Sequence, residues 1–78
     1  MNERQQIIYM QARLIRLASE KWGEPIERIA ELFDKHHVLK YIEDCFGIFH
    51  VEVDEEILED IVGYLKNKGV SWIEKINE

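Results

Sequence analysis

The stretch that decides the fold is residues 7–22, IIYMQARLIRLASEKW. Its apolar side chains recur every three or four positions, which is the spacing of one face of an α-helix. Gly23 follows as a natural helix stop, and Pro25 suits the first turn of a second helix because its ring presets φ. The sequence therefore predicts a long first helix, over about residues 2–22, with one broad buried side.

Three further segments show helical spacing, over about residues 25–35, 38–46 and 54–68, and Gly47 and Gly69 are the expected stops of the last two. Asp54 is the expected N-cap of the last of these helices. The stretch IFHVEV is β-branched and aromatic, so we expect an extended connector around residues 48–53. A short C-terminal helical tail is expected after Gly69. The prediction is an all-α fold, a compact bundle of about four helices in a single domain over residues 1–78.

Length and composition restrict the classes of function. A chain of 78 residues with 46% hydrophobic and 33% charged residues builds one packed domain with little room for a deep cavity. A core of this size usually needs a further stabilising element, and a lone Cys45 offers no intrachain disulfide. The N-terminus has no signal-peptide pattern, and no apolar run approaches the length of a membrane span. We therefore expect a soluble cytoplasmic protein that does not enter a membrane.

The formal charge of -6 is concentrated in one segment, since residues 41–65 hold eight acids and no Lys or Arg. On the last main helix the acids lie opposite the apolar stripe, and like charges four residues apart are locally unfavourable. One interpretation is that they suit the helix dipole and keep the protein soluble. The other interpretation is a face that steers and docks a basic protein partner. The residues of this candidate partner-binding site are Glu55, Glu56, Glu59, Asp60 and Gly63.

The same charge distribution does not favour a nucleic-acid partner, because such binding depends on Lys and Arg that neutralise phosphates. The second and third helices resemble a helix-turn-helix pair in spacing, which leaves a transcriptional regulator as an alternative function. Lys40 is the only basic side chain that the third helix offers to it.

Metal and catalytic chemistry find little support. His36, His37, Cys45 and His50 are potential zinc ligands by type, but adjacent residues on a helix diverge by about 100°, and Cys45 lies in an apolar stripe. No nucleophile stands at a recognisable spacing from a base, and no Gly-rich phosphate loop is present. We expect no metal, no cofactor and no catalytic residues. A metal-dependent enzyme is the least favoured alternative.

Several residues point to an oligomer contact, with either a protein partner or a second copy of the chain. Gln11 lies near the centre of the first helix's apolar side, so its amide needs a hydrogen-bonding partner inside the fold or across an interface. Leu32 is off the main stripe of the second helix. The tail adds apolar residues that either close the core or contact another chain. The candidate contact residues are Gln11, Leu32, Trp72, Ile73 and Ile76.

From about residue 17 to residue 70 the sequence resembles a family of short, uncharacterised bacterial proteins, classed as a domain of unknown function. The resemblance lies in Tyr41-Ile42, Phe49-His50, and Asp60-Ile61 with Tyr64-Leu65-Lys66 and Gly69. Val51-Glu52-Val53 stand where Thr and Gly commonly follow the histidine. The resemblance implies no activity or catalytic residues. Some similar proteins are encoded beside ADP-ribosyltransferase-like genes, an arrangement similar to a toxin and its antitoxin, which favours a binding module.

Overall fold

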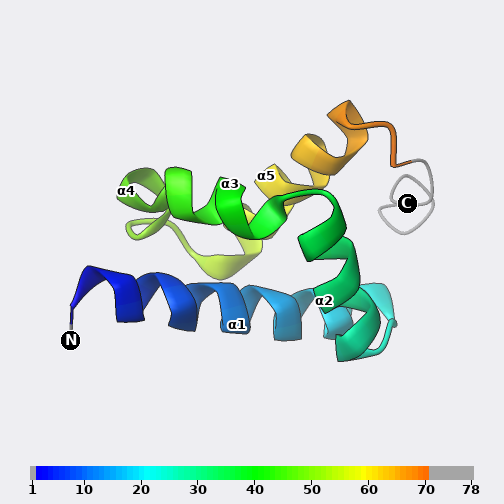
Figure 1. Ribbon diagram of the computed structural model, residues 1–78, viewed down its shortest axis with the longest axis horizontal. Coiled ribbons are helices and arrows are strands. Elements are labelled where there is room, and N and C mark those ends of the chain that lie inside the picture. Colours follow the sequence, from blue (N-terminus) through cyan, green and yellow to red (C-terminus); the bar gives the residue numbers. More distant parts are fainter. Residues whose placement is uncertain (1, 71–78) are drawn as a thin grey trace.

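The computed structural model describes residues 2–70, which form five helices (Figure 1). Their bounds are α1 Glu3–Trp22, α2 Ile26–Lys35, α3 Val38–Asp44, α4 Phe46–Phe49 and α5 Asp54–Asn67. The described chain contains no strand, so the predicted all-α class is confirmed. No helix within residues 2–70 combines the length and the apolar content that crossing a membrane requires.

The first helix begins and ends where the sequence predicts. The Asn2 side chain caps its start by accepting a hydrogen bond from the Gln5 amide at 2.8 Å. Gly23 ends it in the left-handed conformation, with φ 67° and its amide donating to the Ser19 carbonyl at 3.0 Å. Met10, Leu14 and Ala18 recur every four residues along its buried side.

The other helices pack around α1, which runs the length of the molecule (Figure 1). Helices α3 and α4 follow one another along α1, α2 crosses near its C-terminal end, and α5 lies behind α3 in this view. An edge-on contact between the rings of Trp22 and Phe33, with centroids 6.4 Å apart, joins the end of α1 to α2.

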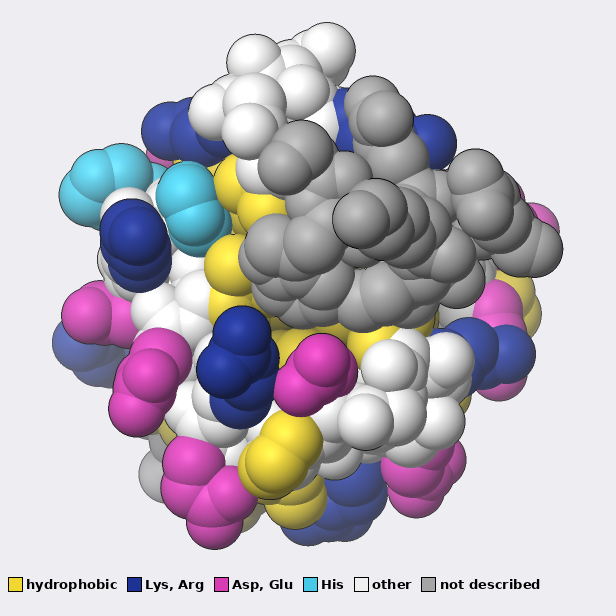
Figure 2. Space-filling model, turned by 90° about the vertical axis from the view of Figure 1, so that its right-hand side faces the viewer, with side chains coloured by type: hydrophobic (Ala, Val, Ile, Leu, Met, Phe, Trp, Pro, Cys, Tyr) yellow, Lys and Arg dark blue, Asp and Glu magenta, His cyan; other side chains and the backbone are white. Residues whose placement is uncertain are grey.

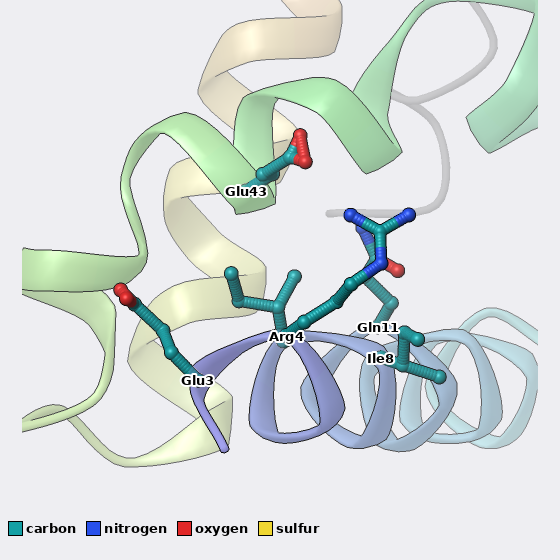
Figure 3. Close-up of a pocket in the computed structure, with 6 residues that line it drawn as sticks. Glu3, Arg4, Ile8, Gln11 and Glu43 are labelled. Atoms are coloured by element: carbon teal, nitrogen blue, oxygen red, sulfur yellow. The ribbon is translucent and has the colours of Figure 1, made fainter.

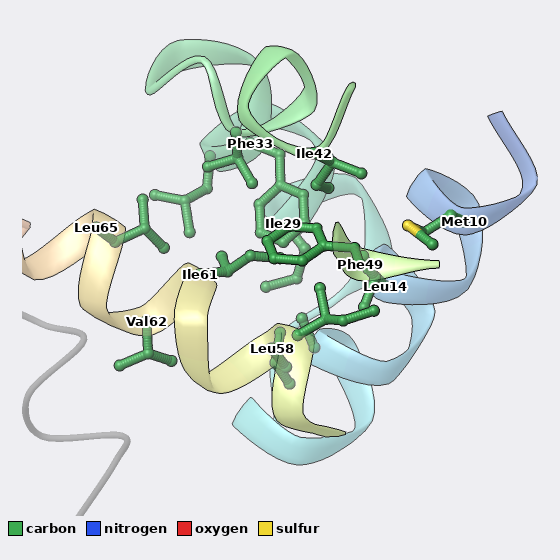
Figure 4. Packing of buried hydrophobic residues seen from close by; sticks show 14 of the residues in the cluster. Met10, Leu14, Ile29, Phe33, Ile42, Phe49, Leu58, Ile61, Val62 and Leu65 are labelled. Atoms are coloured by element: carbon green, nitrogen blue, oxygen red, sulfur yellow. The ribbon is translucent and has the colours of Figure 1, made fainter. Parts of the chain in front are cut away.

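The core is one continuous apolar cluster to which every helix contributes (Figure 4). Leu14, Ile29, Phe33 and Ile61 are completely buried. Each fully buried side chain of this size contributes about 1.5–3 kcal/mol of transfer free energy. The buried residues are Met10, Leu14, Ala18, Ile29, Leu32, Phe33, Val38, Ile42, Phe46, Phe49, Ile57, Leu58, Ile61, Val62, Leu65 and Val70.

The predicted extended connector over residues 48–53 is wrong in its first half, and Gly47 does not end a helix. The chain bends at Cys45 and continues as α4, with the amides of Ile48 and Phe49 both donating to the Cys45 carbonyl at 2.9 Å. Phe46 and Phe49, three residues apart, are both buried, so one helical turn places both rings in the core. Tertiary burial therefore overrides the local preference for an extended chain. Of these six residues, Val53 has extended dihedrals, with φ -79° and ψ 152°.

The start of α5 is also displaced by one residue from the prediction. Val53 occupies the N-cap position, and the Asp54 carboxylate makes no cap hydrogen bond. It instead pairs with Arg13 of α1, at 3.1 Å between Nε and Oδ2. At the other end Gly69 has φ 82°, and the Val70 amide donates to the Leu65 carbonyl at 3.1 Å. The predicted C-terminal tail lies outside the described residues.

Candidate interaction surface

The five residues of the predicted partner-binding site lie together on α5. We call Glu55, Glu56, Glu59, Asp60 and Gly63 the acidic face. All five are exposed. They lie across the helix from its buried stripe, which consists of Ile57, Leu58, Ile61, Val62 and Leu65. The helical arrangement expected from the sequence is therefore present.

The charges of this face are not neutralised within the described chain. Among residues 2–70 none of its four acids forms an ion pair. Two other acids of the 41–65 segment are paired, Asp54 with Arg13 at 3.1 Å and Asp44 with Lys40 at 2.9 Å. The negative potential of the acidic face is consequently open to solvent, where it acts at a range of about 8–10 Å at moderate salt.

Negative charge extends from the acidic face toward α3. Burial raises the pKa of the Tyr41 phenol, and the nearby Cys45, Asp60 and Glu52 raise it further. Burial likewise raises the pKa of the Cys45 thiol, with added contributions from Asp44 and Asp60. Asp60 thus lies close enough to these two groups for its charge to disfavour their anions.

The end of the molecule at which α1 stops has a different character. Figure 2 views the end at which α1 stops and α2 lies, where basic and acidic side chains are interspersed. Along α2, Arg28 pairs with Glu24 at 3.5 Å. The side chains seen at this end are therefore of both signs, unlike those of the acidic face.

Gly63 makes a gap in the acidic face. A Cβ atom built on it would meet no atom of residues 2–70 within 4 Å, so packing among these residues does not require glycine there. Its helical backbone also needs no positive φ. A glycine in the middle of a helix costs about 0.5–1 kcal/mol relative to alanine, and packing within the described chain does not compensate for that cost.

An aromatic cluster lies beside the acidic face, and the sequence alone did not predict its contacts. The rings of Tyr41 and Tyr64 stack at 4.3 Å with 18° between their planes, and Phe49 meets Tyr41 edge-on at 5.6 Å. The Lys68 ammonium lies 5.1 Å from the Tyr64 centroid. The Tyr64 hydroxyl donates to the His36 carbonyl at 3.0 Å. These residues hold α3 and the α2–α3 turn against α5, and they position the acidic face.

The candidate oligomer residues that the structure describes are used inside the fold. The Gln11 amide nitrogen donates to the Leu39 carbonyl of α3 at 2.9 Å, so its hydrogen-bonding partner is internal. Leu32 belongs to the core and is 8% exposed. Neither residue presents a free apolar surface. Trp72, Ile73 and Ile76 lie outside the described residues.

A shallow hollow of about 290 Å³ separates the first half of α1 from α3 (Figure 3). Arg4 extends from α1 toward α3, where Glu43 lies on the other side of the opening, and Ile8 and Gln11 lie along α1. Both signs of charge line it.

The histidines and the cysteine are dispersed. His36 and His37 form the α2–α3 turn, where His37 adopts φ 60°, a strained conformation that the sequence did not reveal. The His50 Nδ1 atom lies 3.0 Å from the Phe46 carbonyl, and its ring stacks on Phe46 at 5.5 Å. Within residues 2–70 no three His, Cys, Asp or Glu side chains are grouped so that they could hold a metal ion.

Comparison with known proteins adds the family. No curated protein and no solved structure matches the chain. One family model matches residues 9–68, which cover α2, α3, α4 and α5 and most of α1. The match spans well over half of the 78 residues. The chain therefore belongs to the family described as a protein of unknown function, DUF3791.

Proposed function

We propose that the protein is a small interaction module that acts by binding, and that its acidic face docks onto a basic surface of a protein partner. The observation that carries the proposal is the exposure of Glu55, Glu56, Glu59 and Asp60 without an ion-pair partner in the described chain. Complementary potentials raise association rates and suppress wrong partners, and one-signed surfaces provide them.

The cost of this arrangement supports the proposal. Glu55 and Glu59 are four residues apart, as are Glu56 and Asp60, and like charges at this spacing each destabilise a helix by about 0.2–0.5 kcal/mol. Acids in the first turn of α5 gain from the helix dipole, but this benefit ends within that turn. Glu59 and Asp60 lie beyond it. A basic partner would offset the repulsion that the fold leaves uncompensated.

Gly63 supports a close approach by the partner. It lies on the same side as Glu56 and Glu59, and its missing side chain leaves the α5 backbone accessible. Close packing of a second helix or loop against a backbone favours glycine at the contact. The gap is thus a place where a partner's chain can rest between flanking carboxylates.

The partner that we propose is a protein for which this chain is an antitoxin-like or regulatory subunit. The resemblance to proteins encoded beside ADP-ribosyltransferase-like genes makes such an enzyme the first candidate. DNA is a less suitable partner, because Lys40, the one basic residue of α3, is held by Asp44 at 2.9 Å and is flanked by Glu43.

The first experiment is untagged co-purification from the native cell with mass spectrometry, with products of neighbouring genes as first candidates. Binding kinetics then locate the face. Glu56→Lys, Glu59→Lys and Asp60→Lys together should slow association and weaken its dependence on salt. The matched control reverses three exposed acids of α2, Glu27→Lys, Glu31→Lys and Asp34→Lys, with the same change in net charge. Equal effects of the two triple variants, or none from the first, would contradict the proposal.

Gly63→Ala separates the structural role of α5 from its role in binding. The new methyl group meets no atom of the described chain, so we expect the free energy of unfolding to rise by about 0.5–1 kcal/mol. We also expect the variant to bind the partner more weakly, mainly through faster dissociation. A more stable variant that binds unchanged would show that no chain packs against Gly63.

A further inference from the structure

A second surface, chemically distinct from the acidic face, carries three of the large apolar side chains that the described chain exposes. Tyr9 of α1 is 52% exposed, and Val51 and Val53 of the α4–α5 turn are 77% and 58% exposed. Clusters of large apolar residues in water mark interaction sites more often than single ones do. We call the surface formed by Tyr9, Arg13, His50, Val51 and Val53 the turn face.

Three of these residues, Tyr9, Arg13 and His50, line one hollow. A depression of about 270 Å³ between α1 and α4 is lined by Tyr9, Arg13 and His50, with Met10 and Phe46 from the core. Val51 directly follows His50 in the chain. Val53 directly precedes Asp54, whose carboxylate holds Arg13. Each valine is therefore the chain neighbour of a residue that lines the hollow or holds one of its walls.

The walls of the hollow are already ordered in the single chain. The His50 ring is held by its Nδ1 contact with the Phe46 carbonyl at 3.0 Å and by stacking on the Phe46 ring at 5.5 Å. Arg13 is held by two hydrogen bonds to Asp54, at 3.1 and 3.4 Å. Side chains fixed before binding lose less conformational entropy when a partner covers them.

Charge distinguishes the turn face from the acidic face. The adjoining hollow along α1, of about 210 Å³, is lined by Arg13, Arg16, Glu20 and Asp54 around Leu17, so cations and anions alternate there. A surface that meets its own copy across a two-fold axis must be complementary to itself. Alternating charges permit this, because a rotated copy can place cations opposite anions. The one-signed acidic face would repel its own copy.

We propose that the turn face is the interface of a homodimer with two-fold symmetry. The occupant of the hollow is an apolar side chain of the second copy, with Val51 as the most exposed candidate. The polar rim of this interface consists of Arg13, Arg16, Glu20 and Asp54. The two hollows extend along α1 from Gln6 to Glu20, about 21 Å at the rise of an α-helix. This length suits an interface of standard size, about 800 Å² per partner.

A dimer would also provide the additional stabilisation that a domain of this size needs. One core of fewer than about 80 residues rarely supplies more than about 3–5 kcal/mol. The described chain holds no disulfide and no group of metal-ligating side chains. Association adds stability through mass action and makes the melting temperature rise with protein concentration. The dimer is argued from the turn face alone, so it does not depend on the proposed function.

The test is sedimentation equilibrium of the full chain over a wide range of concentrations. We expect the mass of two chains. Val51→Asp puts a charge in place of the apolar side chain that we propose to enter the hollow, and it should weaken the dimer about tenfold or more. Ile26→Asp is the matched control, since Ile26 is an apolar residue of α2 with 49% exposure, and the dimer should persist. Circular dichroism checks that both variants remain helical.

Three results would overturn the proposal. The wild-type chain could stay monomeric at every concentration, it could form species larger than two chains, or Val51→Asp and Ile26→Asp could affect dimerisation equally. Tyr9→Ala gives a second, independent position on the same face and should also weaken the dimer. Reversing Glu56, Glu59 and Asp60 should leave the dimer intact, so failure of the dimer and failure of the acidic-face proposal remain distinguishable.

Discussion

Tyr64 connects three parts of the chain through one side chain. Its ring stacks on Tyr41 of α3, and its hydroxyl donates to the carbonyls of His36 at 3.0 Å and His37 at 3.4 Å. The hydroxyl therefore secures the α2–α3 turn to α5. The turn needs such support because His37 holds a positive φ of 60°.

Tyr64→Phe tests this hydroxyl. The ring and its stacking are retained, so we expect the free energy of unfolding to fall by about 1 kcal/mol, the net value of one hydrogen bond. Urea denaturation measures it. Tyr41→Phe is the matched control, because the Tyr41 hydroxyl forms no hydrogen bond within the described chain, and it should cost only a few tenths of a kcal/mol. Equal losses from the two variants would argue against this role of Tyr64.

The strain at His37 can be relieved by glycine. A non-glycine residue in the left-handed region pays about 1–2 kcal/mol, partly offset by the larger backbone entropy that glycine loses on folding. We expect His37→Gly to stabilise the protein by about 0.5–1 kcal/mol, seen as a higher melting temperature. Gly23→Ala is the reverse experiment at φ 67° and should destabilise by a similar amount. A destabilised His37→Gly variant would mean that the imidazole itself supports the turn.

Helix α5 is positioned on α1 by a pair of charges as well as by its apolar stripe. Arg13 and Asp54 are 41 residues apart in the chain and meet at 3.1 Å, with 50% and 31% of their side chains exposed. Exposed pairs are weak because water and salt screen them. The apolar stripe of α5 carries the packing energy, and the ion pair adds a weak contact between α1 and the first residue of α5.

A double-mutant cycle on Arg13→Ala and Asp54→Ala measures this contribution. We expect a coupling energy below about 1 kcal/mol that disappears at high salt. The pair Lys40 and Asp44 within α3 gives the reference for a local contact, about 0.3–0.5 kcal/mol. A coupling energy for Arg13 and Asp54 that does not change with salt would show that the pair is better shielded from water than its exposure indicates.

At the scale of the whole molecule, the fold disfavours the anionic forms of two side chains, the Tyr41 phenol and the Cys45 thiol. Burial, followed by neighbouring groups, raises the pKa of both Tyr41 and Cys45. The folded state keeps these protons at pH values where the unfolded chain releases them. Their stabilisation is therefore complete below the unfolded pKa values, about 8.5 for Cys and about 10 for Tyr, and is lost as the pH rises above them.

We accordingly expect the urea midpoint to decline as the pH is raised from about 8.5 toward 11. The double variant Cys45→Ala and Tyr41→Phe removes both titrations and should flatten that part of the profile, although its stability at neutral pH also changes. An unaltered slope in this variant would assign the alkaline loss to other groups.

Much of the architecture was accessible from the sequence, because it depends on local patterns. Apolar spacing identified α1, α2 and α5, and Gly23 fixed the end of the first helix through a left-handed turn that glycine adopts without strain. Helical periodicity also placed Glu56, Glu59 and Asp60 opposite the buried stripe. These features require only the geometry of one helix.

The rest was decided by contacts between residues far apart in the chain. Burial of both Phe46 and Phe49 made a helix of a segment with extended preferences, and Arg13 drew Asp54 away from a capping role. Gln11 found its partner 28 residues away, and the turn face exists only because α1 and the α4–α5 turn meet. A sequence pattern specifies which side of a helix is apolar. Which surfaces then remain exposed depends on how the helices cover one another, and only the tertiary structure determines that.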